Sequence, residues 1–110
     1  ILDRKKDMIV SGGFNIYPSD LEGILAKHPA ILECAVVGVQ SVEWGETPLA
    51  FAVLRLGMNA TAEELREFAN AKLGKTQRIS KVEIVESLPR SAIGKILKRE
   101  LRDEYEAKRA

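Results

Sequence analysis

A lysine in a segment punctuated by proline and glycine is the residue of this sequence best suited to chemistry. Lys95 directly follows Gly94, and Pro89 stands near the start of the same segment, residues 88–95. Because proline and glycine interrupt regular structure, the segment is predicted to be a loop with the lysine at its tip. A mobile ammonium group suits the binding of phosphate or carboxylate oxygens. The spacing therefore predicts an anion-binding lysine.

Basic residues gather in two places, and a solvated surface is the competing interpretation of both. One cluster lies in residues 3–7, and the other runs from Arg90 to Arg102. Acidic side chains at Glu100 and Asp103 intersperse the second cluster, as is common on exposed helices. The whole chain has a formal net charge of +1, which provides no bulk field for nucleic acid or a membrane surface. Any anion site must therefore be local.

The sequence contains no self-contained active site. His28 is the single histidine, and no cysteine stands at ligand spacing from it, so a capping or packing role is favoured and no metal site is predicted. Cys34 precedes the apolar run Ala35-Val36-Val37 and is interpreted as a packed core thiol rather than a nucleophile. The serines lack a nearby histidine that could activate them.

Several apolar segments have the length and pattern of strands. Residues 8–16 form two short apolar runs around a pair of glycines, and they predict a β-hairpin. Residues 33–39 and 49–54 are nearly continuous apolar runs, typical of strands covered on both faces, and are expected to be central neighbours in a sheet. Residues 81–86 alternate with period two and predict a half-exposed edge strand.

Three segments follow helical spacing. A capping-box pattern at Ser19 predicts a first helix over residues 19–28, and the same pattern at Thr61 predicts a second helix that ends at Gly74. A final charged helix is indicated by apolar residues four apart, Ile93, Leu97, Leu101 and Tyr105. Together the elements predict an α+β fold, a small mixed sheet of about three strands packed with helices, plus an N-terminal two-stranded β-hairpin.

Length and composition predict one domain. A chain of 110 residues with 45% hydrophobic residues can build one ordinary core. No apolar stretch approaches the roughly 20 residues that cross a bilayer, and no signal-peptide pattern is present. A lone cysteine suits a reducing compartment, so a soluble cytoplasmic protein is expected. Because the sequence starts at Ile1 without a methionine, we expect it to be a piece of something longer.

Two motifs resemble the signatures of a known enzyme superfamily. Residues 3–22 read Asp-Arg-Lys-Lys-Asp-Met-Ile-Val-Ser-Gly-Gly-Phe-Asn-Ile-Tyr-Pro-Ser-Asp-Leu-Glu. This run looks like the hinge and hairpin of adenylate-forming enzymes, which include acyl-CoA synthetases, luciferases and peptide-synthetase adenylation domains. Residues 88–101 resemble the catalytic-lysine signature of the same enzymes. The run from Gly94 to Arg99 is similar to that of acyl-CoA synthetases in particular.

The resemblance implies that this chain is the mobile C-terminal domain of an acyl-CoA synthetase. Its partner would be a large N-terminal domain of the same enzyme, which holds the acyl pocket and most of the ATP site. In that family a carboxylate attacks the α-phosphate of ATP to give an acyl-adenylate, and the thiol of CoA then displaces AMP while the small domain rotates between the steps. ATP, CoA and a small carboxylic or fatty acid are the implied substrates, with Mg²⁺ bound outside this domain. The isolated chain is expected to be inactive.

The same resemblance implies roles for individual residues. Lys95 would be the catalytic residue of adenylation, Arg4 would bind the nucleotide ribose, and Lys6 would be the hinge residue within residues 3–7. The hairpin of residues 8–17 would approach CoA through the residues of its turn, which are Ser11, Gly12, Gly13 and Asn15. The segment from Thr76 to Ser80 departs from the family pattern, which leaves contacts to the CoA phosphates open.

Two other functions stay open. An adenylation domain would pass the acyl group to a carrier-protein thiol instead of CoA. A free-standing binding module would use the basic surface from Arg90 to Arg102 for nucleic acid, but a near-zero net charge and few aromatic residues argue against that partner. The spacing of Pro89, Gly94 and Lys95 also resembles the site at which acyl-CoA synthetases are switched off by acetylation, so a lysine acetyltransferase is a further expected partner.

Overall fold

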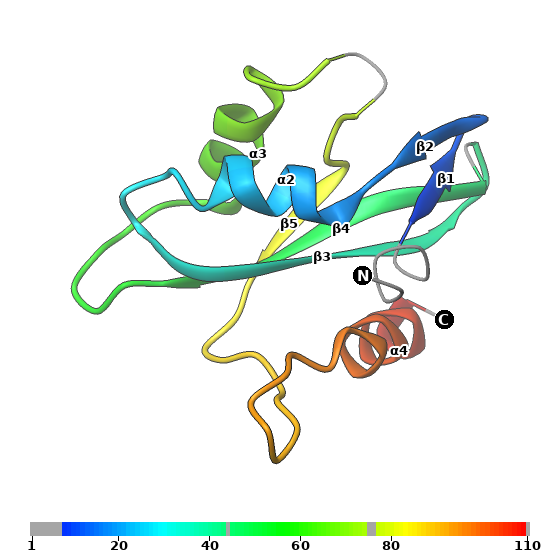
Figure 1. The fold of residues 1–110 in the computed structure, drawn as a ribbon. Helices are drawn as coiled ribbons and strands as arrows, with labels where there is room; N and C mark the ends of the chain where they lie inside the picture. Colours follow the sequence, from blue (N-terminus) through cyan, green and yellow to red (C-terminus); the bar gives the residue numbers. More distant parts are fainter. Residues whose placement is uncertain (1–7, 44, 75–76, 110) are drawn as a thin grey trace.

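The computed structural model describes residues 8–43, 45–74 and 77–109, and it arranges them as a five-stranded sheet with helices on both faces (Figure 1). In chain order the elements are β1 (Ile9–Ser11), β2 (Phe14–Ile16), α2 (Pro18–Leu25), β3 (Ile31–Ser41), β4 (Gly45–Leu54), α3 (Ala62–Asn70), β5 (Lys81–Ile84) and α4 (Lys98–Arg109).

Strand β4 is the centre of the sheet. It pairs antiparallel with β3 along its whole length, from Gly45 opposite Ser41 to Leu54 opposite Ile31. On its other edge β4 pairs in parallel with β5, and near its start it meets β1. Strand β1 pairs antiparallel with β2. The predicted mixed sheet with an N-terminal hairpin is therefore confirmed, and the two central strands are neighbours as expected.

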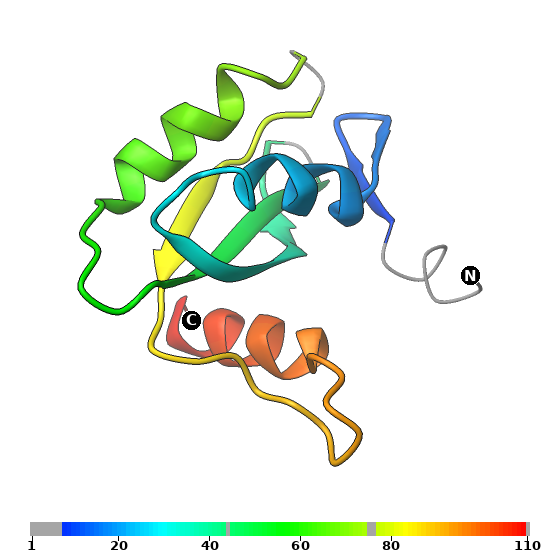
Figure 2. The ribbon, with the colours of Figure 1, turned by 60° about the vertical axis from the view of Figure 1, so that its left-hand side comes forward.

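Alternate side chains of β3 and β4 enter two separate hydrophobic clusters. Val36 and Ala50 face the first cluster, which side chains of α2, α3 and the hairpin complete. Val37 and Leu49 face the second cluster, which includes Leu101 of α4. Figure 2 shows α2 and α3 on one side of the sheet and α4 on the other. Burial on both sides explains why these strands are almost continuously apolar in sequence.

The two capping-box predictions have opposite outcomes. At α3 the box forms, because the Glu64 amide donates to Thr61 Oγ1 and the Thr61 amide donates to Glu64 Oε1, each at 3.1 Å. At α2 it does not form, and the prediction is wrong. The helix begins at Pro18 with Tyr17 as its N-cap residue, one residue before the predicted start. A proline suits the first helical turn, where its missing N–H costs nothing.

The end of α2 also differs from the prediction, since the helix stops at Leu25 and leaves His28 in the following turn. There His28 Nδ1 accepts a hydrogen bond from the Ala30 amide at 3.1 Å, and the imidazole packs edge-on against Phe68. The histidine thus caps a turn and packs, as the sequence suggested.

Helix α4 begins at Lys98, so the predicted inclusion of Ile93 and Leu97 is wrong. Gly94 has a φ of +85°, a conformation that a right-handed helix cannot contain. Ile93 is consequently 88% exposed in a loop, whereas Leu101 and Tyr105 pack on the second cluster.

Two carboxylates occupy the outer edge of β3. The Val36 amide donates to Glu22 Oε2 at 2.8 Å, and the Gln40 amide donates to Glu106 Oε2 at 3.1 Å. Glu22 Oε2 also lies 2.7 Å from Lys98 Nζ. One carboxylate of α2 therefore connects that helix to β3 and, through Lys98, to α4.

The cysteine is a packed thiol. Cys34 is half-buried beside the first cluster, and its Sγ donates to the Glu22 carbonyl oxygen at 3.5 Å. Burial, followed by the negative charge of Glu22, raises the pKa of Cys34 from 9.0 to about 11. A thiol in this environment is a poor nucleophile at neutral pH, which agrees with the sequence interpretation.

We expect Gly38→Ala to destabilise the fold. A Cβ at Gly38 would lie 3.0 Å from Ile9 Cγ1, and Ile9 is only 1% exposed, so it has little room to move. The expected loss is about 1–3 kcal/mol of unfolding free energy, measured by urea denaturation. Gly23→Ala is the matched control, since no described atom lies within 4 Å of its added Cβ. In the middle of α2 it should stabilise by about 0.5–1 kcal/mol, and a loss at Gly23 equal to that at Gly38 would contradict the packing argument.

We expect native Cys34 to react slowly with iodoacetamide. Because its pKa of about 11 lies two pH units above 9.0, its thiolate fraction at pH 8 should be about 100-fold below that of an ordinary thiol. Mass spectrometry of the native and the urea-unfolded chain would measure both rates. The protection should shrink as the pH rises toward 11, where the folded thiol ionises. Equal rates in the two states at pH 8 would rule out the raised pKa.

Candidate functional site

The turn of the N-terminal hairpin brings four of the predicted site residues together. Ser11 pairs with Phe14 across a two-residue turn, in which Gly12 and Gly13 have φ values of +57° and +87°. Such a turn requires positive φ at both positions, which glycine adopts without strain. Both glycines and Asn15 are exposed, and no described atom lies within 4 Å of a Cβ placed at Gly13. The turn therefore offers bare backbone to a neighbouring molecule.

Buried side chains hold the base of the hairpin, and Ser11 beside the turn pairs with Gly45 of β4. Ile9 and Ile16 are opposite each other and each is 1% exposed in the first cluster. The Val10 amide donates to Glu46 Oε1 at 3.1 Å, which adds a polar link to β4. These contacts fix the direction of the strands and leave the turn projecting.

The lysine loop, residues 88–97, is a second projecting segment. Its base is anchored by Leu88, which is 5% exposed, and by Ile96, which packs on the second cluster. Arg90 and Ile96 form an isolated antiparallel bridge, and the Leu97 amide donates to the Pro89 carbonyl at 2.8 Å. The structure thus confirms that Lys95 lies in a loop, and backbone hydrogen bonds join the two ends of that loop.

Short-range hydrogen bonds shape the tip of the lysine loop. The Gly94 amide donates to the Ser91 carbonyl at 2.9 Å, and the Ser91 amide donates to the Lys95 carbonyl at 2.8 Å. The Lys95 amide donates to Ser91 Oγ at 3.3 Å. The Lys95 side chain is exposed at this tip.

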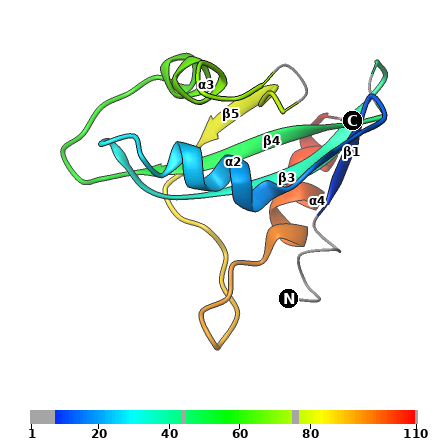
Figure 3. The same ribbon diagram turned by 45° about the horizontal axis from the view of Figure 1, so that its top comes forward.

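The hairpin and the lysine loop belong to opposite faces of the sheet. The hairpin contributes Ile9 and Ile16 to the cluster under α2 and α3, whereas the loop contributes Leu88 to the cluster under α4. Figures 1 and 3 both show the two segments projecting from different parts of the domain. The structure therefore does not bring Lys95 to the turn that holds Ser11 and Gly13.

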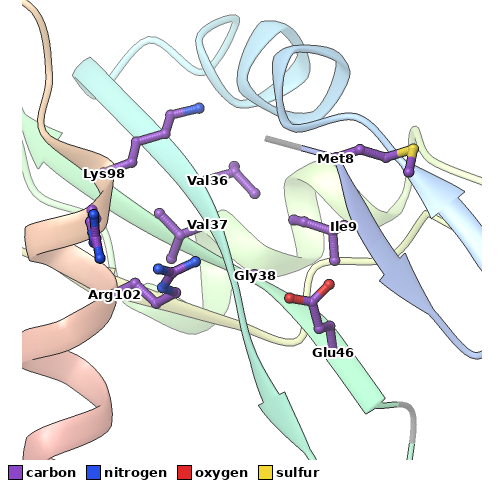
Figure 4. A pocket seen from close by; sticks show the side chains of 9 residues that line it. Met8, Ile9, Val36, Val37, Gly38, Glu46, Lys98 and Arg102 are labelled. Atoms are coloured by element: carbon purple, nitrogen blue, oxygen red, sulfur yellow. The ribbon is translucent and has the colours of Figure 1, made fainter. Parts of the chain in front are cut away.

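A groove of about 350 Å³ separates β1 from α4 at the outer edge of β3 (Figure 4). Ile9 forms an apolar wall, Glu46 lies near it, and the cationic side chains of Lys98 and Arg102 come from the facing helix. Both cations have acidic neighbours, because Lys98 pairs with Glu22 and Arg102 Nε lies 3.8 Å from Asp103. Sequence reasoning found the basic cluster but missed the groove, because the groove depends on how β1 and α4, which are distant in sequence, are placed around β3.

The remaining site predictions have no structural test. Arg4 and Lys6, together with the proposed hinge of residues 3–7, lie outside the described residues. Within the described ranges, no group of three side chains that could hold a metal ion is present. No helix there is long and apolar enough to span a membrane. On α3 a hydrogen bond from Arg66 lowers the pKa of Glu63, and the same bond raises the pKa of Arg66, but neither residue is in the hairpin or the lysine loop.

Comparison with known proteins identifies relatives over almost the whole chain. A 2-succinylbenzoate–CoA ligase of Bacillus cereus is 47% identical over 102 residues, which are 93% of this chain and 21% of that protein. A long-chain-fatty-acid–CoA ligase of Bacillus subtilis is 46% identical over 104 residues, which are 94% of this chain and 19% of that protein. The chain therefore spans about a fifth of the length of the curated relatives it matches.

The fold has a close counterpart among solved structures. The ATP-bound MatB from Rhodopseudomonas palustris matches with a TM-score of 0.88 and 33% identity, covering 92% of this chain and 20% of that one. Residues 20–95 match the family model described as the AMP-binding enzyme C-terminal domain. This match covers more than half of the chain and includes most of α2, the central strands and Lys95, so the chain belongs to the AMP-binding enzyme C-terminal domain family.

Proposed function

We propose that this chain is the mobile C-terminal domain of an AMP-forming acyl-CoA synthetase. The enzyme forms an acyl-adenylate from ATP and a carboxylic acid, and it then transfers the acyl group to the thiol of CoA. The observation that carries this proposal is the placement of the hairpin and the lysine loop on opposite faces of one sheet. A rigid domain with this arrangement presents one segment to an active site in one orientation and the other segment after rotating. Two successive steps at one site fit such a domain.

Lys95 serves the first step in this proposal. Its ammonium stands on an exposed, hydrogen-bonded tip, where it can enter the active site of a partner domain. There it would offset the negative charge that develops on the carboxylate and phosphate oxygens during adenylation. Arg4 would bind the nucleotide ribose, and Lys6 would absorb the change in backbone dihedral angles as the domain rotates.

The hairpin turn serves the second step. A thiol-bearing arm can approach Gly12 and Gly13 closely because both lack side chains and stand exposed. Ser11 and Asn15 flank the same turn and could donate or accept hydrogen bonds there. Both curated relatives described above are named CoA ligases, which favours CoA over a carrier-protein thiol as the acceptor.

The acid substrate belongs to the part of the enzyme outside this chain. Relatives named for a succinylbenzoate and for long-chain fatty acids match this chain at 47% and 46% identity. Near-equal similarity to enzymes of different acids indicates that these residues do not select the acid. We therefore assign the acyl pocket, most of the ATP site and the accompanying Mg²⁺ to a large N-terminal domain. A reducing cytoplasm fits the single free thiol of Cys34.

We expect Lys95→Ala in the full-length enzyme to reduce adenylation by about 10²–10³-fold, because one aimed charge is lost from the transition state. Thioester formation from preformed acyl-adenylate should stay within about threefold of wild type. Pyrophosphate release and acyl-CoA formation, assayed separately, measure the two steps. Lys27→Ala is the control, since Lys27 is exposed but lies outside both projecting segments. Equal losses in both steps for Lys95→Ala would contradict the role of Lys95 in adenylation. Acetylation of Lys95 by a lysine acetyltransferase removes the same charge and should reproduce the Lys95→Ala result.

We expect Gly13→Asn to impair thioester formation more than adenylation, which is the opposite of the effect expected for Lys95→Ala. Asparagine tolerates positive φ better than most residues, so the turn should persist while the new side chain obstructs the thiol arm. Thioester formation should fall about tenfold or more, and adenylation should stay within about twofold. Gly57→Asn is the matched control, because Gly57 has a φ of +80° and no described atom within 4 Å of an added Cβ. Undiminished thioester formation in Gly13→Asn would overturn the role of the hairpin.

A further inference from the structure

The tip of the lysine loop needs a contact that fixes its direction. Ile93 is 88% exposed, and Ala92, Gly94 and Lys95 are exposed with it. The hydrogen bonds between Ser91 and Lys95 set the shape of the turn, but they act within the tip and move with it. A tip held only in this way could pivot on its base at Leu88 and Ile96.

Arg90 connects this tip to the sheet. Its Nη1 donates to the Gly94 carbonyl oxygen at 2.9 Å, one residue before Lys95. Its Nη2 donates to Glu33 Oε1 on β3, a residue 57 positions away in sequence. One planar guanidinium therefore spans from the backbone beside Lys95 to a strand of the central sheet, and the rigid fork of its donors limits how far the tip can pivot.

Because the Arg90–Glu33 ion pair is exposed, it is better suited to positioning the lysine loop than to stabilising the fold. The Arg90 and Glu33 side chains are 42% and 27% exposed, and ion pairs at such positions contribute little to folding. Catalysis is more sensitive to geometry, because a misplacement of about 1 Å can cost about 100-fold in rate. The contacts of Arg90 to Gly94 and Glu33 lie within this domain, so these two contacts act on the position of the loop that carries Lys95.

We propose that Arg90 and Glu33 are positioning residues that hold the Lys95 loop against β3 for the adenylation step. This inference rests on the proposed function, in which Lys95 acts in that step. It assigns the pair no role in thioester formation, because the hairpin that serves that step packs on the other face of the sheet.

The test uses the full-length enzyme with Arg90→Lys, Glu33→Gln and the double variant. Lysine keeps the charge but cannot donate in a fork to two acceptors, and glutamine keeps the shape of Glu33 but not its charge. Arg66→Lys is the matched control, since Arg66 donates through two nitrogens to Glu63 on α3, outside the loop. Each enzyme is assayed for both half-reactions, for deuterium uptake in a peptide spanning residues 90–97, and for its melting temperature.

We expect Arg90→Lys to lower kcat of adenylation about tenfold, with KM for ATP and acid within about twofold and thioester formation unchanged. Deuterium uptake in residues 90–97 should rise, while the melting temperature and the Arg66→Lys control stay at wild-type values. The double variant should lose no more activity than Arg90→Lys alone, since both substitutions break one link.

Two outcomes distinguish a failure of the positioning role from a failure of the proposed function. If Lys95→Ala abolishes adenylation while Arg90→Lys changes neither adenylation nor deuterium uptake, the positioning role is overturned and the proposed function stands. If Lys95→Ala leaves adenylation intact, the proposed function fails, and the catalytic part of this inference fails with it. Equal losses in both half-reactions for Arg90→Lys would indicate a merely structural role and would also overturn the inference.

Discussion

Burial of β4 on both faces is the constraint on which the rest of the domain depends. From Pro48 to Val53 each residue of this strand is buried, and the strand pairs along both of its edges. Apolar side chains that alternate between two faces need cover on both, so helices must lie on either side of the sheet. The chain therefore places the hairpin on one side and the lysine loop on the other. The two covered faces of the domain follow from the apolar run of residues 48–53 in this one strand.

Elements that local patterns specify were predicted well. The paired glycines of the hairpin and the capping box at Thr61 form as their spacing predicted, because each needs partners only a few residues away. The capping box at Ser19 failed because the Glu22 carboxylate bonds instead to Val36 and Lys98, which are distant in sequence. The start of α4 was misplaced because the positive φ of Gly94 is not visible in a spacing of apolar residues.

The candidate site divides in the same way. Lys95 and the hairpin residues were proposed as site residues from short motifs, in which the residues stand at consecutive or nearby positions. The link from Gly94 through Arg90 to Glu33 was not foreseen, since it joins positions 57 residues apart. The groove between β1 and α4 was missed for the same reason. Candidate residues that stand close together in sequence can be predicted from short motifs. The contacts that orient them join distant residues and form only when the strands are paired.

The carboxylates on the outer edge of β3 have a consequence for how this domain behaves beside other copies of itself. An uncovered strand edge is a template on which another chain can add a strand and begin to aggregate. Here the Val36 and Gln40 amides are already occupied by Glu22 and Glu106, so these two donors are not available to another strand. If the domain rotates as proposed, it exposes different surfaces in its two positions. Because the domain's own side chains already use two donors of this edge, β3 is a poorer template on which a neighbouring chain can add a strand.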